Sequence, residues 1–363
     1  MANGESPLLG SFTFHHTGWT LPDSSVAMWT CEPFVVVNPW DGYSISQTSA
    51  RITSLKSTYP NLKIAVRAHY RGDRSIPAEN DMTELNQFLN GVVDAAKNYQ
   101  PFRDHVSLWI CANEPNITNE GAVPASWAQR VLNGGTALDN FAEKIRYVAG
   151  DMGSLPNAVI GSPAVAPYDP TVNETDSNWR YSATAHPYLN YLHSVLKRAK
   201  AAGDAKARRI VNVACLHVAG RIGSGGSANG GRLEPRRSVV EQTYGSQFGT
   251  QAIREMVQVV DAAFASLPLA VDEFTTYMDG YGAEVNYVRG WLQEALKAID
   301  YGVNRLATPT GRTRLWFAAW FIGRGQVGAD WSSTALEHLM TLSPGTRGRD
   351  LVDEFNALVD RFA

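Results

Sequence analysis

The chain has 363 residues, of which 44% are hydrophobic and 18% charged, a balance typical of a globular protein. Its 32 basic and 35 acidic side chains are mixed along the sequence and leave a net charge of −3. No basic stripe of the kind that nucleic-acid binding requires stands out, so nucleic acid is not expected as a partner. A chain of this length can bury a large core without disulfides or a structural metal, and it suits one α/β barrel with long loops.

The cysteine content and the distribution of apolar residues exclude other classes. The three cysteines, Cys31, Cys111 and Cys215, form no CxxC pair or Cys/His cluster, so no zinc site is predicted. Two of them fall inside apolar runs, where a thiol behaves as a small hydrophobic group. No segment approaches the roughly 18 apolar residues of a membrane span. Because the N-terminus lacks the pattern of a signal peptide, we expect a cytoplasmic protein, or a secreted one expressed without its signal.

Apolar runs that predict strands alternate with amphipathic stretches that predict helices. The predicted strands are Ser11–His16, Phe34–Asn38, Leu62–His69, Val106–Asn113, Asn157–Val165, Arg209–His217, Leu267–Phe274 and Arg314–Phe321. The predicted helices are Asp81–Asn98, Phe141–Met152, Tyr188–Ala202, Thr250–Ala265, Val285–Tyr301 and Leu351–Phe362. Strand alternating with helix indicates parallel βαβ units. Eight mostly apolar strands favour a closed (β/α)8 TIM barrel, with residues 1–363 as one domain.

One predicted connection is much longer than the others. Residues 218–249 follow the sixth predicted strand and include a glycine-rich run at 223–231. In a TIM barrel the loops after the strands surround the active site, and a loop of this length is usually functional or mobile. Two interpretations stay open, a lid or substrate-binding loop and a passive insertion.

Two glutamates end apolar strands, where folding needs no charge. Glu114 follows Asn113 and precedes Pro115 at the end of the fourth predicted strand, and its parity places it on the face of Leu108, Ile110 and Ala112. Proline cannot donate to a strand ladder, so we expect the strand to end there. Glu273 ends the seventh strand, while the neighbouring Asp272 has the opposite parity and is expected to be structural. Since burying an unpaired carboxylate is costly, two of them at strand ends indicate the acid and base groups of glycosidic bond cleavage.

The Asn113-Glu114-Pro115 motif after a fourth strand, with Glu273 ending a seventh, resembles the clan of TIM-barrel retaining glycoside hydrolases that includes cellulases, mannanases and β-glycosidases. The resemblance implies that Glu114 is the acid/base, Glu273 the nucleophile and Asn113 a ligand of the sugar 2-hydroxyl. It also implies two carboxyl groups about 5 Å apart, a separation that permits direct attack and retention of configuration.

The same resemblance implies a supporting set of residues. Trp320, near the end of the eighth strand, is similar to the sugar-stacking tryptophan of the clan. His217 ends the sixth predicted strand, where the clan often has a His or Tyr near the nucleophile. Arg67 and His69 share one face of the third strand, whereas the clan usually places such an Arg and His on separate strands. A cation at Arg67 would keep Glu273 ionised, and a surface salt bridge is the alternative for Arg67.

Aromatic residues are frequent in the predicted loops and suit a cleft that stacks several sugars. They are Trp40, Tyr43, Tyr70, Trp127, Tyr168, Trp179, Tyr277, Tyr281 and Trp331.

These observations predict a retaining hydrolase of β-linked glycosides, with a carbohydrate substrate and with no metal or cofactor. The alternative is a TIM barrel that binds carbohydrate without catalysis. A lyase or aldolase is less well supported, because Lys63 begins its strand instead of ending it. The sugar, and endo or exo action, stay open.

Overall fold

The computed structural model describes residues 12–15, 29–135, 138–152, 158–166, 187–206, 209–222, 233–234, 253–265, 267–276, 289–290, 292, 315–321 and 341–362. The chain divides into two compact units. One, the central unit, contains Cys31–Leu216 and Val259–Pro268. The other, the terminal unit, contains Met1–Thr30, His217–Gln258 and Leu269–Ala363.

The strands of the central unit follow the order β5-β4-β3-β2. Their bounds are Trp29–Val37 for β2, Lys63–Arg71 for β3, Val106–Cys111 for β4 and Ile160–Gly161 for β5. The pairings β3–β4 and β4–β5 are parallel. Every residue of β3 from Ile64 to Tyr70 is buried, as expected of a strand covered on both faces.

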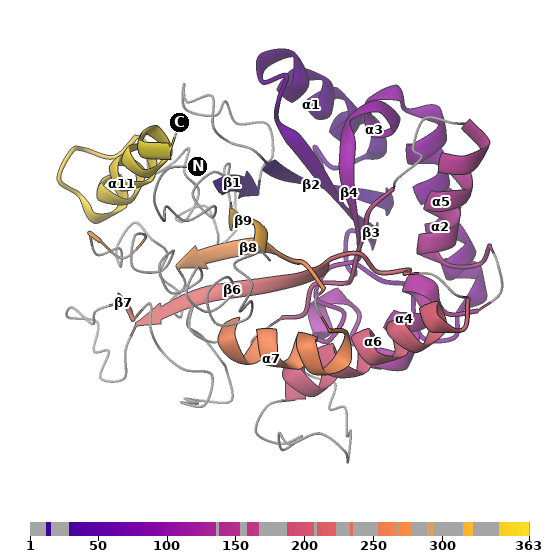
Figure 1. Ribbon diagram of the computed structural model, residues 1–363. Helices are drawn as coiled ribbons and strands as arrows, with labels where there is room; N and C mark the ends of the chain where they lie inside the picture. Colours follow the sequence, from indigo (N-terminus) through magenta and orange to yellow (C-terminus); the bar gives the residue numbers. More distant parts are fainter. Residues whose placement is uncertain are drawn as a thin grey trace. The chain divides into compact units, whose positions relative to one another are not determined.

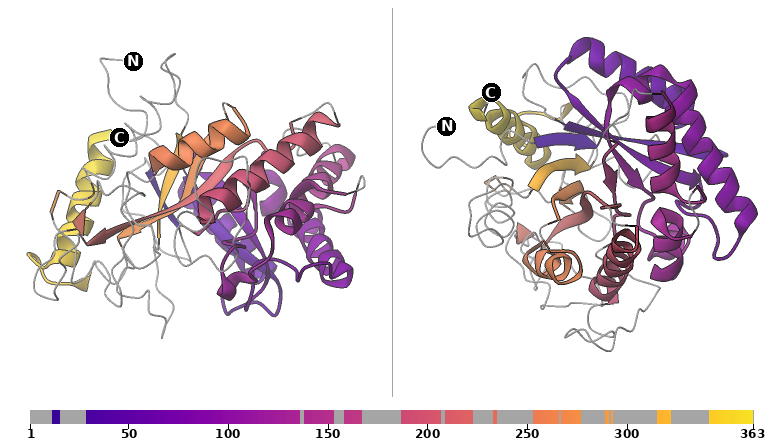
Figure 2. Two further views of the ribbon diagram at one scale, coloured as in Figure 1. Left: turned by 90° about the horizontal axis from the view of Figure 1, so that it is seen from below. Right: turned by 45° about the vertical axis from the view of Figure 1, so that its right-hand side comes forward.

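The helices that the structure describes in the central unit are α1 (Ile45–Thr58), α2 (Met82–Asn98), α3 (Gln100–His105), α4 (Ala125–Asn133), α5 (Phe141–Met152) and α6 (Pro187–Asp204). Helix α2 begins where Asp81 accepts hydrogen bonds from the N–H groups of Thr83 and Glu84. It buries Leu85, Phe88 and other residues at helical spacing. Helices α2 and α5 pack side by side, as do α4 and α6 (Figures 1 and 2). This layer covers the outer face of the strands.

The terminal unit contains a second set of strands in the order β1-β9-β8-β6-β7. Their bounds are Phe12–His15 for β1, Leu315–Phe321 for β9, Leu269–Thr276 for β8, Ala214–Ile222 for β6 and Leu233–Glu234 for β7. The first and last strands in the chain, β1 and β9, pair in parallel, and so do β8 and β9. Helix α11 (Arg347–Phe362) belongs to this unit, while α7 (Ile253–Ala263) and β6 each run from one unit into the other.

Each of the eight predicted strands overlaps an observed strand, in an α/β architecture with parallel pairing. The prediction of one loop over residues 218–249 was wrong in part. Strand β6 continues to Ile222, where Arg221 and Ile222 pair antiparallel with β7. The glycine-rich run at 223–231 and almost all of the predicted helix Val285–Tyr301 lie outside the described residues. The closed barrel and the single domain stay predictions.

The three cysteines are buried and free, as small hydrophobic groups should be, and burial raises the pKa of the Cys111 thiol. Among the described helices, none has the length and apolar character that crossing a membrane requires.

Candidate active site

Glu114 lies on an unusual turn just beyond β4. The strand ends at Cys111, so Pro115 does not end it as predicted. Ala112 and Glu114 then adopt positive φ angles of 67° and 32°, a left-handed region that residues with a Cβ rarely occupy. These angles break the strand alternation, so the predicted parity of Glu114 with the strand residues does not apply. Glu114 is buried, with 5% of its surface exposed.

Hydrogen bonds hold this turn on both sides of the glutamate. The Ser75 hydroxyl donates to the Asn113 carbonyl. The Glu114 carbonyl accepts from the Ile117 N–H at 3.1 Å. Further on, the Asn116 amide donates to the Ala166 carbonyl at 3.1 Å and accepts from the Ala166 N–H at 2.9 Å. The backbone that carries Glu114 is therefore fixed on the chain segments after β3 and β5.

The Asn113 side chain lies beside Glu114 and makes a contact that the sequence did not predict. Its Nδ2 donates to Glu120 Oε1 at 3.1 Å, and the residue is 5% exposed. Glu120 returns to this point because Thr118–Glu120 forms a 3-10 turn closed by Gly121 at φ 116°. The sequence signal for this contact was the Glu-Gly pair at 120–121, since glycine readily adopts a positive φ after a helical turn.

Arg67 and His69 lie together on β3, as predicted. Arg67 Nε donates to His69 Nε2 at 3.3 Å, so this imidazole nitrogen carries no proton. Both residues are buried, which excludes the surface salt bridge considered for Arg67. The Trp40 ring packs against His69 at a centroid distance of 5.7 Å, and Trp40 keeps 38% of its surface exposed.

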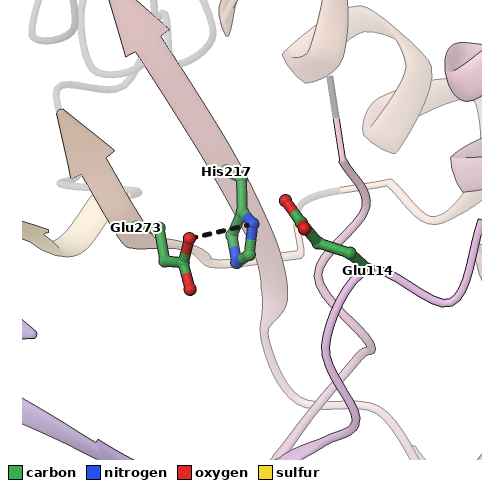
Figure 3. Close-up of side chains that lie close together, drawn as sticks. All are labelled: Glu114, His217 and Glu273. Atoms are coloured by element: carbon green, nitrogen blue, oxygen red, sulfur yellow. Dashed lines mark ion pairs between the residues drawn. The ribbon is translucent and has the colours of Figure 1, made fainter. Parts of the chain in front are cut away.

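Glu273 shares a histidine with its neighbour Asp272. His217 Nδ1 lies 3.5 Å from Glu273 Oε2, and His217 Nε2 lies 3.4 Å from Asp272 Oδ2. Figure 3 shows the first of these contacts. Both His217 and Asp272 are buried, and the Glu273 side chain is 14% exposed. His217 lies within β6 and does not end it, which corrects the predicted strand boundary.

An irregularity in β8 explains how two consecutive carboxylates reach one imidazole. Between Val271 and Phe274, three steps along β8 oppose two steps along β9, from Ala318 to Trp320. Such a bulge redirects side chains that would otherwise alternate. The opposite parity expected for Asp272 and Glu273 therefore does not separate them.

The shared histidine has a direct electrostatic consequence. A neutral imidazole has one N–H and can donate to one carboxylate, whereas an imidazolium donates to both. Where Nδ1 carries the proton, it can donate to Glu273 Oε2, and this contact stabilises the carboxylate form of Glu273. His217 and Glu273 carry ligand atoms of the kinds that bind divalent cations.

The remaining predicted site residue is Trp320. Its backbone lies in β9, opposite Phe14 of β1 and Phe274 of β8. Its side chain lies outside the described part of the structure.

The sequence matches no protein-family model, and no curated protein matches it. Solved structures share the fold at low identity. The virulence factor SghA, in complex with its substrate analog salicin, is 10% identical with a TM-score of 0.55 over 93% of this chain and 82% of that one. A family 44 xyloglucanase from Paenibacillus polymyxa is 11% identical with a TM-score of 0.51, over 87% of this chain and 73% of that one. The family 44 endoglucanase Cel44A from Clostridium thermocellum is 12% identical with a TM-score of 0.50, over 87% and 72% of the two chains. The chain is therefore similar in fold to TIM-barrel glycoside hydrolases.

Proposed function

We propose that this protein is a retaining hydrolase of β-linked glycosides, with Glu273 as nucleophile and Glu114 as acid/base, on a closed TIM barrel. The observation that carries the proposal is the position of these carboxylates, with Glu114 just after β4 and Glu273 in the second half of β8. The similarity in fold to TIM-barrel glycoside hydrolases supports it.

The proposed reaction has two displacements. A Glu273 oxygen attacks the anomeric carbon and forms a glycosyl ester, while the Glu114 carboxyl gives its proton to the leaving oxygen. Glu114, now a carboxylate, takes a proton from water, and the water oxygen attacks the anomeric carbon and releases Glu273. The two inversions restore the configuration of the substrate.

The two glutamates need different protonation states for these roles. Glu273 needs to be ionised before the first step, and a proton on His217 Nδ1, 3.5 Å from its Oε2, stabilises that form. Glu114 needs to be protonated before the first step, so that it can give its proton to the leaving oxygen. We propose that Asn113 binds a hydroxyl of the sugar, that Trp320 stacks on a sugar face, and that Arg67 and His69 bind the substrate or act beside the nucleophile.

Replacement of each glutamate tests the assignment. In Glu273→Gln the amide cannot form the glycosyl ester, so kcat on nitrophenyl β-glycosides should fall roughly 1,000-fold or more. In Glu114→Ala, azide should restore part of the rate on these activated substrates, because it replaces the water that lacks a base. Exposed Glu79 gives a matched control, and Glu79→Gln should keep the wild-type rate.

The outcomes also separate this proposal from a barrel that only binds carbohydrate. Turnover by the wild type with retained anomeric configuration in NMR supports the retaining hydrolase. A Glu273→Gln variant with a near wild-type rate would contradict the assignment of the nucleophile. Glycan binding without turnover of any glycoside or β-linked polysaccharide would favour the non-catalytic alternative.

A further inference from the structure

The amide of Asn113 uses only one of its two polar ends within the described protein. Nδ2 donates to Glu120 Oε1 at 3.1 Å. Oδ1 is buried and accepts no hydrogen bond from any residue that the structure describes. A buried carbonyl oxygen without a donor is unfavourable, so this oxygen is available to a ligand that brings one.

Asn116, three residues further on, shows the opposite arrangement. It is fully buried, its Nδ2 donates to the Ala166 carbonyl, and its Oδ1 accepts from the Ala166 N–H. Both ends of this amide hold the backbone together, which is a structural role. The two asparagines lie on one turn and are both buried. They differ because Asn113 Oδ1 accepts no hydrogen bond from the described residues.

The contact between Asn113 and Glu120 is fixed through the backbone. The Ser75 N–H donates to the Glu120 carbonyl at 3.2 Å, and the Ser75 hydroxyl donates to the Asn113 carbonyl. Ser75 itself is fully buried. One residue thus holds the backbones of both partners, so Glu120 and Asn113 have little freedom to separate.

Glu120 also determines which end of the amide it meets. An ionised carboxylate accepts hydrogen bonds and donates none. If the Asn113 amide turned over, Oδ1 would face Oε1, and two acceptors would repel each other without a proton between them. The amide nitrogen therefore faces Glu120, and the oxygen faces the other way.

We propose that Glu120 is a positioning residue that orients Asn113, so that Asn113 Oδ1 accepts a hydrogen bond from a substrate hydroxyl. This inference rests on the proposed function, in which Asn113 binds the sugar, and it specifies the direction of that bond. The hydroxyl acts as the donor. A substrate with fluorine in its place, which can only accept, should be bound no better than the deoxy sugar.

The orientation can be measured without any turnover. In protein labelled with 15N-asparagine, the Asn113 side-chain signal is identified by its loss in Asn113→Asp. One of its Nδ2 protons should resonate downfield because it is bonded to a carboxylate, and Glu120→Ala should remove that shift. Glu79→Gln is the control and should leave the signal in place. An Asn113 signal that is unchanged in Glu120→Ala overturns the proposal.

An exchange of the two side chains tests the direction of the bond to the substrate. Asn113→Asp alone places two carboxylates together and should lower kcat/KM about 100-fold. Adding Glu120→Gln lets the glutamine amide donate to the carboxylate now at position 113 and leaves an oxygen of that carboxylate for the substrate. The kcat/KM of the double variant should be at least about tenfold higher than that of Asn113→Asp. If Asn113 instead donates to the substrate, the double variant has no donor and stays as slow as Asn113→Asp, which overturns the proposal.

The two experiments keep this inference apart from the proposed function. If the wild-type protein turns over no glycoside, the proposed hydrolase function is contradicted. The NMR signal of the Asn113 side chain then still decides whether Glu120 orients the amide. Thermal unfolding of each variant shows whether a lower kcat/KM is caused by loss of the folded structure. Glu120→Gln alone, in which the glutamine oxygen can still accept from Asn113, should keep most of the rate.

Discussion

At the scale of single residues, Glu114 is held in a backbone conformation that its own chemistry disfavours. Ala112 at φ 67° and Glu114 at φ 32° flank Asn113. A residue with a Cβ in this region costs on the order of 1–3 kcal/mol. Hydrogen bonds from Ser75 and Ile117 hold the turn. Strain of this kind is typical of sites where a side chain has to be aimed, which supports the proposed role of Glu114.

Glycine substitutions can measure the strain at Ala112. Ala112→Gly should remove about 1–2 kcal/mol of left-handed strain and cost about 0.4–1 kcal/mol through the freer unfolded chain. The free energy of unfolding should therefore stay equal or rise by up to about 1.6 kcal/mol. Ala68→Gly, in the adjacent β3, relieves no such strain and should lose about 0.5–1 kcal/mol.

Urea denaturation of both variants compares them under one condition. The two alanines are matched, since both are buried and Ala112 N–H bonds to the Ala68 carbonyl. An Ala112→Gly variant that loses as much stability as Ala68→Gly would show that the turn stores no strain.

The sequence predicted the residues whose type is anomalous for their position, and it missed those whose role depends on a turn. Glu114, Glu273 and His217 became candidate site residues because charged or polar groups at the ends of apolar strands need a reason. Glu120 and Ser75 lie in polar loops, where such residues are ordinary, and only the folded turn brings them to Asn113. Asp272 was expected to be separate from Glu273, because the sequence does not reveal the bulge in β8.

At the scale of elements, strands were easier to predict than helices. The strands are continuous apolar runs, and the stretch Ile64–Tyr70 of β3 is buried in the way that such a run requires. Helix α1 was missed because it buries Thr48 and Ser49 beside Ile52 and Leu55, so its apolar periodicity is weak. Its sequence signal is the capping box of Ser44 and Gln47, where each side chain bonds the backbone of the other. Helices α3 and α4 are short, which also weakens a periodic signal.

The loops after β2 and β3 together present one aromatic ring. Trp40 is 38% exposed, and its ring packs edge-on against His69 and Tyr43 at 5.7 and 5.6 Å. Gly72 allows this placement, because a Cβ there would lie 2.9 Å from both the Asn38 carbonyl oxygen and Trp40 Nε1. The ring is therefore held by its neighbours and exposed at the carboxyl ends of the strands, where a TIM barrel binds its substrate.

If Trp40 stacks on a sugar away from the reacting bond, it should affect binding more than chemistry. Trp40→Ala should raise KM about tenfold and leave kcat within about twofold, because uniform binding is lost. Gly72→Ala should change KM in the same direction through displacement of the indole. Tyr147, an exposed aromatic residue of α5, provides the control, and Tyr147→Ala should leave both constants unchanged. A Trp40→Ala variant with wild-type KM on oligosaccharides would refute the role.

At the scale of the whole molecule, the parallel βαβ order followed from the alternation of runs along the sequence. The observed parallel pairing of the first and last strands in the chain, β1 and β9, agrees with the barrel that this order predicts. The division of the chain into two units was not predicted, because three of its four boundaries fall inside regular elements, and the fourth lies directly before β8. These three cross β2 between Thr30 and Cys31, β6 between Leu216 and His217, and α7 between Gln258 and Val259. No linker marks these positions in the sequence.

Boundaries inside strands and helices predict that the units unfold together. A strand such as β6 cannot lose its hydrogen bonds in one half and keep a native geometry at the first residue of the other half. Opening one unit would therefore disrupt three elements of its neighbour, and the single domain expected from the sequence should behave as one cooperative unit.

Hydrogen exchange in increasing urea measures this directly, since the slowest amides of β3 and of β8 report on different units. Their free energies of exchange should converge on one value with one urea dependence. If β8 exchanges at a urea concentration where β3 stays protected, the chain consists of two folding units, and the proposed barrel would have to form by their association.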